Sequence, residues 1–322
     1  MKEIAILTGG DSAEYEISLE SANVVLDNLN PEKYKGTIIH LKNNEWNAII
    51  DENYYFVDIN NFTVKLSNST LSFDYVFMAL HGPPAENGNI QNIFDNLNIP
   101  YNSCNADVSA ITFNKFLCNH KLKKLGFKCP NSICIDNIDK INNSVIVKEI
   151  GLPCIIKPNQ SGSSFGVSKV KCKSEIKKAI KLAQKHDNKV LIEQFIDGIE
   201  ISCGVGILHN KITAFPITEI ISQNDFFDFE AKYKGLSKEI TPARISRKIT
   251  NEVQKITQDV YSKMNLKGIC RIDYIIMDDI PYIIEINTIP GLSNESIIPK
   301  QAKELGVTLM QLFDHCIEST IK

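Results

Sequence analysis

Segments typical of strands and helices alternate over the first hundred residues, and this alternation restricts the fold more than any other feature of the sequence. Ile4–Leu7 is a short apolar run, and Tyr75–Leu80 (YVFMAL) is apolar throughout, as expected for a parallel strand that helices cover on both faces. Apolar residues between these runs recur at the spacing of one helix face: Leu19, Ala22, Leu26 and Leu29. A second set follows: Ile90, Ile93, Phe94 and Leu97. The order of strand, loop and helix predicts an α/β domain with a parallel sheet up to about residue 102.

The remaining residues predict further helices and strands. The pattern over residues 106–125 is that of one long helix, which Gly126 and Pro130 end. Shorter helical patterns begin at Ser174 and Ile249. Strands are expected at residues 154–157, 167–171, 190–195, 201–208, 212–221, 269–277 and 282–287.

Charge and composition argue against several classes of protein. Lysine and arginine number 35 and aspartate and glutamate 38, so the net charge is −3 and gives no electrostatic attraction for nucleic acid or an anionic membrane. No apolar run approaches the roughly 20 residues that span a bilayer, and the N-terminal residues lack the features of a signal peptide. The nine cysteines include no CxxC pair that would indicate a zinc site. We expect a cytoplasmic protein without a nucleic-acid or membrane partner.

The last predicted hairpin, residues 269–287, gathers polar side chains on one face. Residues two apart on a strand share a face, so Arg271 and Asp273 point to one side of the first strand. Glu285 and Asn287 likewise share a side of the second strand. With a short turn in the DDIP segment, residue 273 is expected to pair within about one residue of 287. The hairpin therefore places two carboxylates, an amide and a guanidinium together.

Two interpretations of this polar face are open. Carboxylate and amide oxygens are hard ligands that suit Mg²⁺, which also prefers phosphate oxygens and water. The alternative is a solvated strand face with surface ion pairs. The other side of the second strand is expected to carry Ile284 and Ile286, and the strands are otherwise very apolar, which favours the metal site.

The loop PNQSGSSFG is a candidate phosphate-binding loop. Gly162, Ser163, Ser164 and Gly166 would let backbone N–H groups and hydroxyls approach a phosphate closely, and Lys157 on the preceding strand could reach one as well. The loop is not a GxxxxGK[ST] motif and joins two strands, so it is also compatible with an ordinary hairpin connection.

Other candidates are ambiguous when they are considered singly. Glu14 lies in the loop GGDSAEYE and could be an ordinary solvent-exposed residue. His81 ends a buried strand at the carboxyl edge of the sheet, where α/β proteins bind ligands, but a structural histidine is equally compatible. Lys115, Lys232 and Tyr233 could be surface residues. The last two lie in a polar stretch over residues 222–243 that has no period and is interpreted as a long functional loop.

Taken in order, these segments resemble the D-alanine–D-alanine ligases of the ATP-grasp superfamily. The likeness extends nearly end to end and rests on GGDSAEYEISL, LHGPPAENGNIQ, LPCIIKPNQSGSSFGVSKV, FFDFEAKY, CRIDY and IIEINTIPGLSNESIIP. It implies an α/β and α+β protein, with a Rossmann-like N-terminal domain at 1–102 before an ATP-grasp fold. The central ATP-grasp subdomain would span 103–194, and the C-terminal subdomain with the metal sites and a lid would span 195–322.

The implied reaction joins two D-alanines to D-alanyl-D-alanine at the expense of ATP, through a D-alanyl phosphate intermediate. It belongs to peptidoglycan precursor synthesis, and hence to cell-wall biogenesis and cell shape, in the cytoplasm. The resemblance also implies a homodimer and two Mg²⁺ (or Mn²⁺) ions. The metal ligands would be Asp273, Glu285 and Asn287. The nucleotide contacts would be Lys115, Lys157, Gly162, Ser164 and Gly166 for the phosphates, and Glu193 and Glu200 for adenine and ribose.

The resemblance also implies roles toward the amino acid substrates. Arg271 and the backbone N–H of Gly291 match the groups that stabilise the acylphosphate and then the oxyanion. The first D-alanine would be bound by Glu14, with Ser163, Tyr233 and His81, and Lys232 would be a further substrate-binding residue, in the lid that excludes water. Ser296 would bind the carboxylate of the second D-alanine, and the apolar Ile297 suits a methyl side chain.

Four positions depart from the family pattern. The usual GEDG after HG is here AENG at 85–88, Ser161 replaces a glutamate before GSS, Cys270 replaces a glycine before RID, and Glu295 replaces a histidine before Ser296. The first two concern loop geometry. Glu295 is the most consequential, because a negative charge near the second carboxylate could alter the choice of acceptor.

Two other functions are therefore considered. One is a D-alanine–D-serine ligase or another ATP-grasp carboxylate–amine ligase, and the other is a nucleotide-binding protein without ligase activity. The tyrosine at 233 argues against a D-lactate acceptor, and the apolar Ile297 argues against D-serine. The complete set of matched residues argues against loss of activity.

Overall fold

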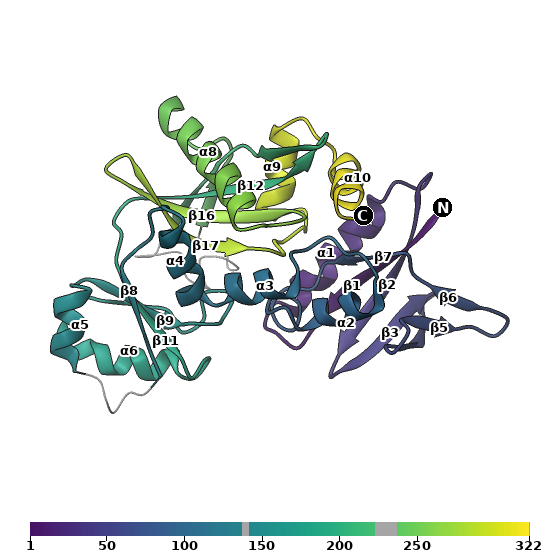
Figure 1. The fold of residues 1–322 in the computed structure, drawn as a ribbon, viewed down its shortest axis with the longest axis horizontal. Coiled ribbons are helices and arrows are strands. Elements are labelled where there is room, and N and C mark those ends of the chain that lie inside the picture. Colours follow the sequence, from purple (N-terminus) through teal and green to yellow (C-terminus); the bar gives the residue numbers. More distant parts are fainter. Residues whose placement is uncertain (137–141, 223–236, 322) are drawn as a thin grey trace.

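The computed structural model describes residues 1–136, 142–222 and 237–321, whose strands form three sheets (Figure 1). In Figure 1 the seven-stranded sheet lies at the right, the four-stranded sheet lies at the lower left, and the six-stranded sheet lies above and between them. No helix in these ranges is long and apolar enough to cross a membrane.

The seven-stranded sheet is only partly parallel. Its order is β6-β5-β4-β3-β2-β1-β7, and β1 (Lys2–Gly9) is parallel to both β2 (Tyr34–Lys42) and β7 (Tyr75–Met78). The other strands are antiparallel: β3 (Glu45–Ile50), β4 (Asn53–Asp58), β5 (Thr63–Lys65) and β6 (Thr70–Ser72). The predicted parallel pairing is confirmed for β1 and β7, but the prediction omits β3 to β6, which two-residue turns with positive φ, such as Asn43 and Asn44, fold into antiparallel hairpins.

The buried residues of helix α1 (Tyr15–Asp27) and of the turn that follows it match the prediction only in part. Ala22 and Leu29 are buried, but Leu26 is exposed. Ser18 and Ser21 are completely buried instead, because their hydroxyls hydrogen-bond to His81. The buried face of α1 therefore carries polar residues that position a candidate site residue.

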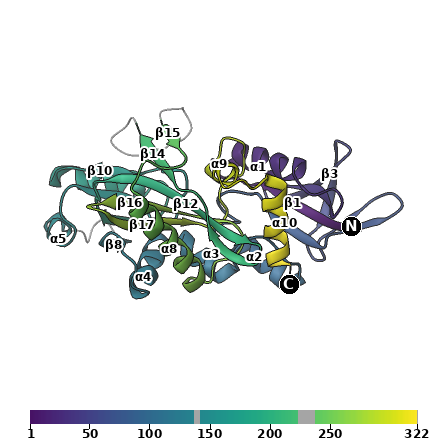
Figure 2. The same cartoon turned by 90° about the horizontal axis from the view of Figure 1, so that it is seen from above.

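Helices α2 (Asn89–Leu97) and α10 (Leu309–Thr320) also pack on the first sheet. Figure 2 shows α10, from the far end of the sequence, beside β1. Phe313 of α10 packs edge-on against Phe77, with 5.3 Å between ring centroids. The C-terminal end of the chain thus completes the core of the N-terminal sheet.

The long helix predicted over residues 106–125 is two helices, α3 (Ala106–Phe113) and α4 (Lys115–Lys124). They are separated at Asn114, which has an extended backbone and whose side chain accepts a hydrogen bond from the N–H of Leu117. An asparagine in this conformation caps a new helix, so the apolar periodicity continues across a break in the backbone. The break places Lys115 in the first turn of α4.

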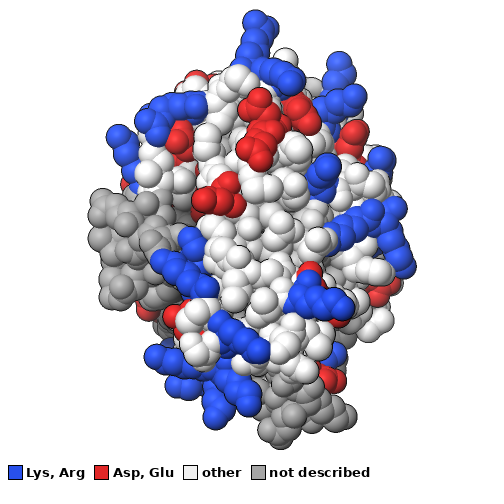
Figure 3. Space-filling view, turned by 90° about the vertical axis from the view of Figure 1, so that its left-hand side faces the viewer, with Lys and Arg blue, Asp and Glu red and all other residues white. Residues whose placement is uncertain are grey.

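The four-stranded sheet is antiparallel, with the order β10-β9-β11-β8. Its strands are β8 (Ser132–Ile135), β9 (Cys154–Pro158), β10 (Ser168–Val170) and β11 (Val190–Gln194), and its helices are α5 (Asn143–Glu149), a 3₁₀ turn at Lys173–Glu175 and α6 (Ile176–Ala183). The predicted inward face of α6 is confirmed: Ile176, Ala179, Ile180 and Ala183 are buried. Figure 3 shows this end of the molecule, where basic and acidic side chains surround an uncharged centre.

The six-stranded sheet is antiparallel, with the order β15-β14-β12-β16-β17 and with β13 paired to β12. Its strands are β12 (Ile199–Leu208), β13 (Lys211–Ala214), β14 (Thr218–Ser222), β15 (Ser237–Ile240), β16 (Cys270–Met277) and β17 (Ile280–Asn287). Helices α8 (Arg247–Lys263) and α9 (Ile297–Glu304) contact strand β12 of this sheet. The single strand predicted over residues 212–221 is therefore two strands, β13 and β14.

Gly268, just before β16, lies against the end of the N-terminal sheet region. Its φ is 68°, and a Cβ there would lie 1.6 Å from the carbonyl oxygen of Asn102. Gly126 also has a positive φ, of 89°, but a Cβ at that position would have nothing within 4 Å, so Gly126 is a matched control for backbone strain alone.

We expect Gly126→Ala to lower the free energy of unfolding by about 1–2 kcal/mol, the cost of a left-handed backbone for a residue with a Cβ. Gly268→Ala should lower it by about 2–5 kcal/mol, because overpacking adds about 1–3 kcal/mol. Urea unfolding of both variants measures the difference. Equal losses would show that the contact with Asn102 is unimportant.

Candidate active site

The β16–β17 hairpin brings the four predicted polar side chains together, although in a different register. Asp273 pairs with Glu285, and Arg271 pairs with Asn287. The prediction that residue 273 pairs within about one residue of 287 is wrong, because the turn has only two residues, Asp278 and Asp279; the β-bulge after Asp273 offsets this difference by one residue. Directly paired residues share a face of the sheet, so the two carboxylates, the amide and the guanidinium still lie on one side.

The same bulge changes the opposite face of β17. Ile286 is buried in the core, as predicted. Ile284 lines a cavity together with its neighbour Glu285, so the prediction that it lies on the other face is wrong. The bulge interrupts the alternation of side chains at this point of the strand.

Two adjoining cavities, of about 350 Å³ and 160 Å³, meet at the hairpin. Predicted residues in the lining of the larger cavity are Glu14, His81, Gly162, Ser163, Arg271, Glu285, Asn287, Gly291, Ser296 and Ile297. Those in the smaller cavity are Lys115, Lys157, Gly162, Ser163, Ser164, Glu193, Glu200, Arg271, Asp273, Glu285 and Ile297. Of the other predicted residues, Gly166 packs against α6 instead, and Lys232 and Tyr233 lie outside the described residues.

Arg271 is held by a double hydrogen bond to a carboxylate. Its Nε and one terminal nitrogen each donate to an oxygen of Asp273 at 2.9 Å, and Asn287 donates to the same carboxylate at 2.9 Å. Burial alone would lower the pKa of Arg271, but the negative charge of Asp273 raises it above its usual value. The guanidinium is therefore a fixed positive charge in the wall that both cavities share.

Two lysines of the smaller cavity are paired with carboxylates. Lys115 Nζ lies 2.6 Å from Glu285 Oε1 and donates to the carbonyl oxygen of Ser161 at 2.8 Å. Lys157 Nζ lies 2.5 Å from Glu193 Oε1, and both of these side chains are buried. Burial would lower the pKa of Lys115, but Glu285 raises it. Both ion pairs thus hold an ammonium group in place along this cavity.

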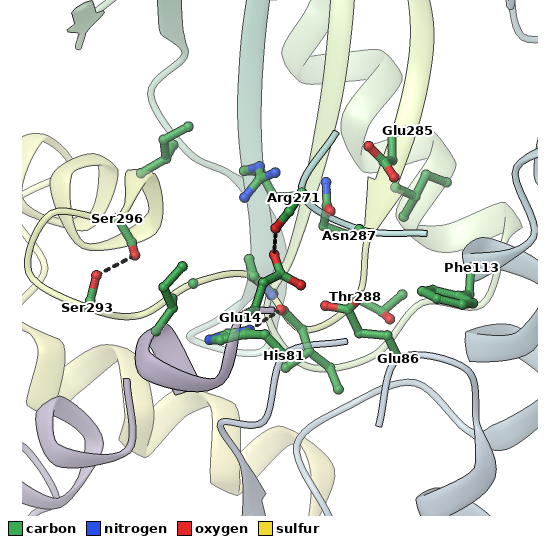
Figure 4. A pocket seen from close by; sticks show the side chains of 18 of the residues that line it. Glu14, His81, Glu86, Phe113, Arg271, Glu285, Asn287, Thr288, Ser293 and Ser296 are labelled. Atoms are coloured by element: carbon green, nitrogen blue, oxygen red, sulfur yellow. Dashed lines mark hydrogen bonds between the residues drawn. The ribbon is translucent and has the colours of Figure 1, made fainter. Parts of the chain in front are cut away.

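Glu14 connects the N-terminal sheet region with the glycine-serine loop. Ser163 Oγ donates to Glu14 Oε1 at 2.6 Å, although the two residues are 149 positions apart. A Cβ at position 162 would lie 2.9 Å from the other carboxylate oxygen, so a larger residue there would displace this end of the Glu14 side chain. In Figure 4, Glu14 and Arg271 point into the same cavity from different elements.

Both ring nitrogens of His81 make polar contacts with neighbouring segments. Its Nδ1 donates to the carbonyl oxygen of Ile289 at 3.0 Å, and its Nε2 lies 2.9 Å from Ser21 Oγ, which also accepts from the N–H of Leu292. Burial lowers its pKa below the usual range, with Glu14 acting in the opposite direction. This network fixes the loop over residues 289–292, to which Gly291 belongs, against α1.

Two family models match the chain. One, described as the D-ala D-ala ligase N-terminus, matches residues 3–104, and the other, the D-ala D-ala ligase C-terminus, matches residues 122–318. The chain belongs to the D-alanine–D-alanine ligase family. This membership confirms the resemblance based on the motifs, the predicted ATP-grasp fold with its N-terminal domain, and the predicted activity of a D-alanine–D-alanine ligase in cell-wall precursor synthesis.

Individual relatives agree with the family assignment. The chain is 47% identical to a D-alanine--D-alanine ligase of Flavobacterium johnsoniae, with 100% of both chains covered. Among solved structures, VanG D-Ala:D-Ser ligase of Enterococcus faecalis is 30% identical, with a TM-score of 0.86 and 98% of each chain covered. The D-alanine--D-alanine ligase of Bacillus anthracis complexed with ATP is 25% identical, with a TM-score of 0.77, covering 99% of this chain and 96% of that one.

Glu86 is a site residue to which sequence reasoning gave no role. It lies in the AENG segment that departs from the family pattern, and it lines the larger cavity near Glu14 and His81 (Figure 4). Burial, and then the charge of Glu14, raise its pKa to about 8. Its position five residues after His81, on the loop at the carboxyl edge of the sheet, was a signal that could have identified it.

We expect Glu86 to make the unliganded protein less stable as the pH rises. The pKa of its carboxyl is near 4.5 in the unfolded state and about 8 in the folded state. Between these pH values the carboxyl is ionised in the unfolded state but still protonated in the folded state. The free energy of unfolding should fall across this window by up to about 1.4 kcal/mol per pH unit. Glu86→Gln should remove this contribution, and the exposed Glu45→Gln should not. Urea unfolding at several pH values across this window measures it, and identical pH profiles for Glu86→Gln and the native protein would contradict it.

Proposed function

We propose that the smaller cavity binds ATP and the larger one binds two D-alanines, with Arg271 acting at the boundary. The observation that carries this proposal is the lining that the cavities share: Ser161, Gly162, Ser163, Arg271, Glu285 and Ile297. A γ-phosphate at this boundary would lie next to the carboxylate that must attack it. Bringing these two anions together is the main difficulty of the reaction, and the paired cations and backbone N–H groups address it.

In this proposal Lys115, Lys157 and the loop over residues 162–166 contact the phosphates, and Glu193 and Glu200 contact adenine and ribose. Asp273, Glu285 and Asn287 would hold two Mg²⁺ or Mn²⁺ ions. Among the described residues, no group of three His, Cys, Asp or Glu side chains is placed to hold a metal by itself. Two carboxylates and an amide nevertheless suit an ion that takes its remaining ligands from phosphates and water. When bound, the ions would neutralise the phosphate oxygens.

Toward the first D-alanine, Glu14 would bind the ammonium group, and Ser163 would fix the Glu14 carboxylate through the 2.6 Å hydrogen bond. The D-alanine carboxylate then attacks the γ-phosphorus, ADP leaves, and an acylphosphate forms. The amine of the second D-alanine attacks the acyl carbon, and inorganic phosphate leaves as the amine loses a proton. Arg271 and the N–H of Gly291 would stabilise the oxyanion in between.

The second D-alanine would lie beside the loop that leads into α9. Ser296 Oγ is held 2.8 Å from Ser293 Oγ, and both line the larger cavity (Figure 4). Ile297 is buried and presents an apolar wall suited to a methyl group. We also propose a lid that includes Lys232 and Tyr233, a cytoplasmic homodimer, and domain boundaries near residues 102 and 194.

The first D-alanine site is tested by Glu14→Gln. This change keeps the size of the side chain but removes the charge that would pair with the ammonium group. Losing a charged hydrogen bond should raise the KM for the first D-alanine by about 10–100-fold, and the KM for ATP should stay within a factor of about two. Glu16→Gln, exposed on the first turn of α1, is the matched control. Equal kinetics for the two variants would contradict the assignment.

A further inference from the structure

Lys300 on α9 contacts three groups that belong to two different segments. Its Nζ donates to the carbonyl oxygen of Glu295 at 2.6 Å and lies 3.3 Å from the carboxylate of the same residue. It also lies 3.2 Å from Glu239 Oε2 on β15. One ammonium group therefore connects β15 with the loop that carries Ser296.

The contacts of Lys300 differ in burial. The Glu239 side chain is 21% exposed and the Glu295 side chain 93% exposed, so the ion pair with Glu295 is largely in water and weak. The short hydrogen bond to the Glu295 carbonyl oxygen and the ion pair with Glu239 are therefore the contacts that join the loop to β15. Lys300 thus acts on the backbone just before Ser296.

Lys300 also affects the electrostatics of the larger cavity. Glu239 and Glu295 both line the cavity, but Lys300 does not. A substrate that presents a carboxylate there meets two negative side chains, which would repel it. Lys300 offsets the charge of Glu239, the less exposed of the two carboxylates.

We propose that Lys300 is a positioning residue for the second D-alanine: it holds the loop at Glu295 against β15 and offsets the charge of Glu239. This inference rests on the proposed placement of the second D-alanine beside Ser296.

The test is Lys300→Met, which keeps an unbranched side chain but removes the charge. The rate of ADP release is fitted with a separate constant for each D-alanine. The KM for the second D-alanine should rise about tenfold, equivalent to about 1.4 kcal/mol, while the KM for the first D-alanine and for ATP change less than about twofold. Lys303→Met, on the exposed face of the same helix, should behave as the unaltered protein.

Two further variants separate the electrostatic role from a packing role. Lys300→Arg should restore the KM for the second D-alanine, because arginine keeps the charge. Glu239→Gln combined with Lys300→Met should recover part of the loss, because it removes a repulsive carboxylate; loss of packing would not be repaired. Thermal unfolding of each variant checks that it is folded. If Lys300→Met does not fold, the kinetics of Lys300→Arg still test the role of the charge.

An unchanged KM for the second D-alanine in Lys300→Met would overturn the inference, as would equal increases in both D-alanine constants. These results differ from failure of the proposed function itself, in which the unaltered protein would form no dipeptide from D-alanine.

Discussion

Replacing Arg271 with methionine should lower kcat by about 10²–10³-fold, the usual cost of removing a donor that stabilises an oxyanion. The guanidinium lies in the wall between the two cavities, where negative charge develops in both steps of the proposed reaction. Asp273 holds it with two hydrogen bonds, so no reorganisation is needed when that charge appears. Methionine keeps most of the apolar stem but cannot supply the charge or the hydrogen bonds.

A matched control is available on the same sheet region. Arg244 makes the same type of double contact, with Glu219, but its side chain is 62% exposed and lies outside both cavities. Arg244→Met should leave kcat within a factor of about two, because exposed ion pairs contribute little. Calorimetric titration with ATP should still detect binding to Arg271→Met. A kcat for Arg271→Met equal to that of Arg244→Met would show that Arg271 has no catalytic role.

Glu285→Gln should impair both metal binding and turnover. Glu285 pairs with Asp273 across the hairpin and contacts Lys115, so its carboxylate lies at the centre of the proposed phosphate site. An amide of the same size cannot provide the negative charge that Mg²⁺ prefers. We expect kcat to fall about 10²-fold or more, as for other groups that stabilise transition-state charge.

Metal binding can be measured without turnover. Electron paramagnetic resonance detects free Mn²⁺ in the presence of ADP and protein, and Glu285→Gln should leave more of it free than the unaltered protein does. Asp279→Asn, in the turn of the same hairpin, is the control, because it lies outside both cavities. If Glu285→Gln bound Mn²⁺ as tightly as Asp279→Asn, the proposed metal ligands would be wrong.

The sequence predicted the composition of the hairpin face better than its register. The two-residue alternation of strands is sufficient to place Arg271 beside Asp273 and Glu285 beside Asn287. No local pattern in the sequence around Asp273 predicts the β-bulge that follows it. Strict alternation therefore predicts the wrong face for Ile284.

Local capping and long-range contacts account for the other differences. Asn114 interrupts an apolar pattern that continues on either side of it, so periodicity alone joins two helices. The burial of Ser18 and Ser21 depends on His81, about 60 residues away, and a hydrophobic pattern cannot predict polar residues in a core. The contact between Lys115 and Glu285 likewise joins residues 170 positions apart.

The most direct test measures product formation. The purified protein would be incubated with ATP, Mg²⁺ and either D-alanine, L-alanine, or D-alanine together with D-serine, and phosphate release and product mass would be recorded. We expect phosphate release only when D-alanine is present, with D-alanyl-D-alanine as the main product even when D-serine competes. No release with D-alanine, or a preference for the mixed D-alanyl-D-serine product, would contradict the proposed use of the two cavities.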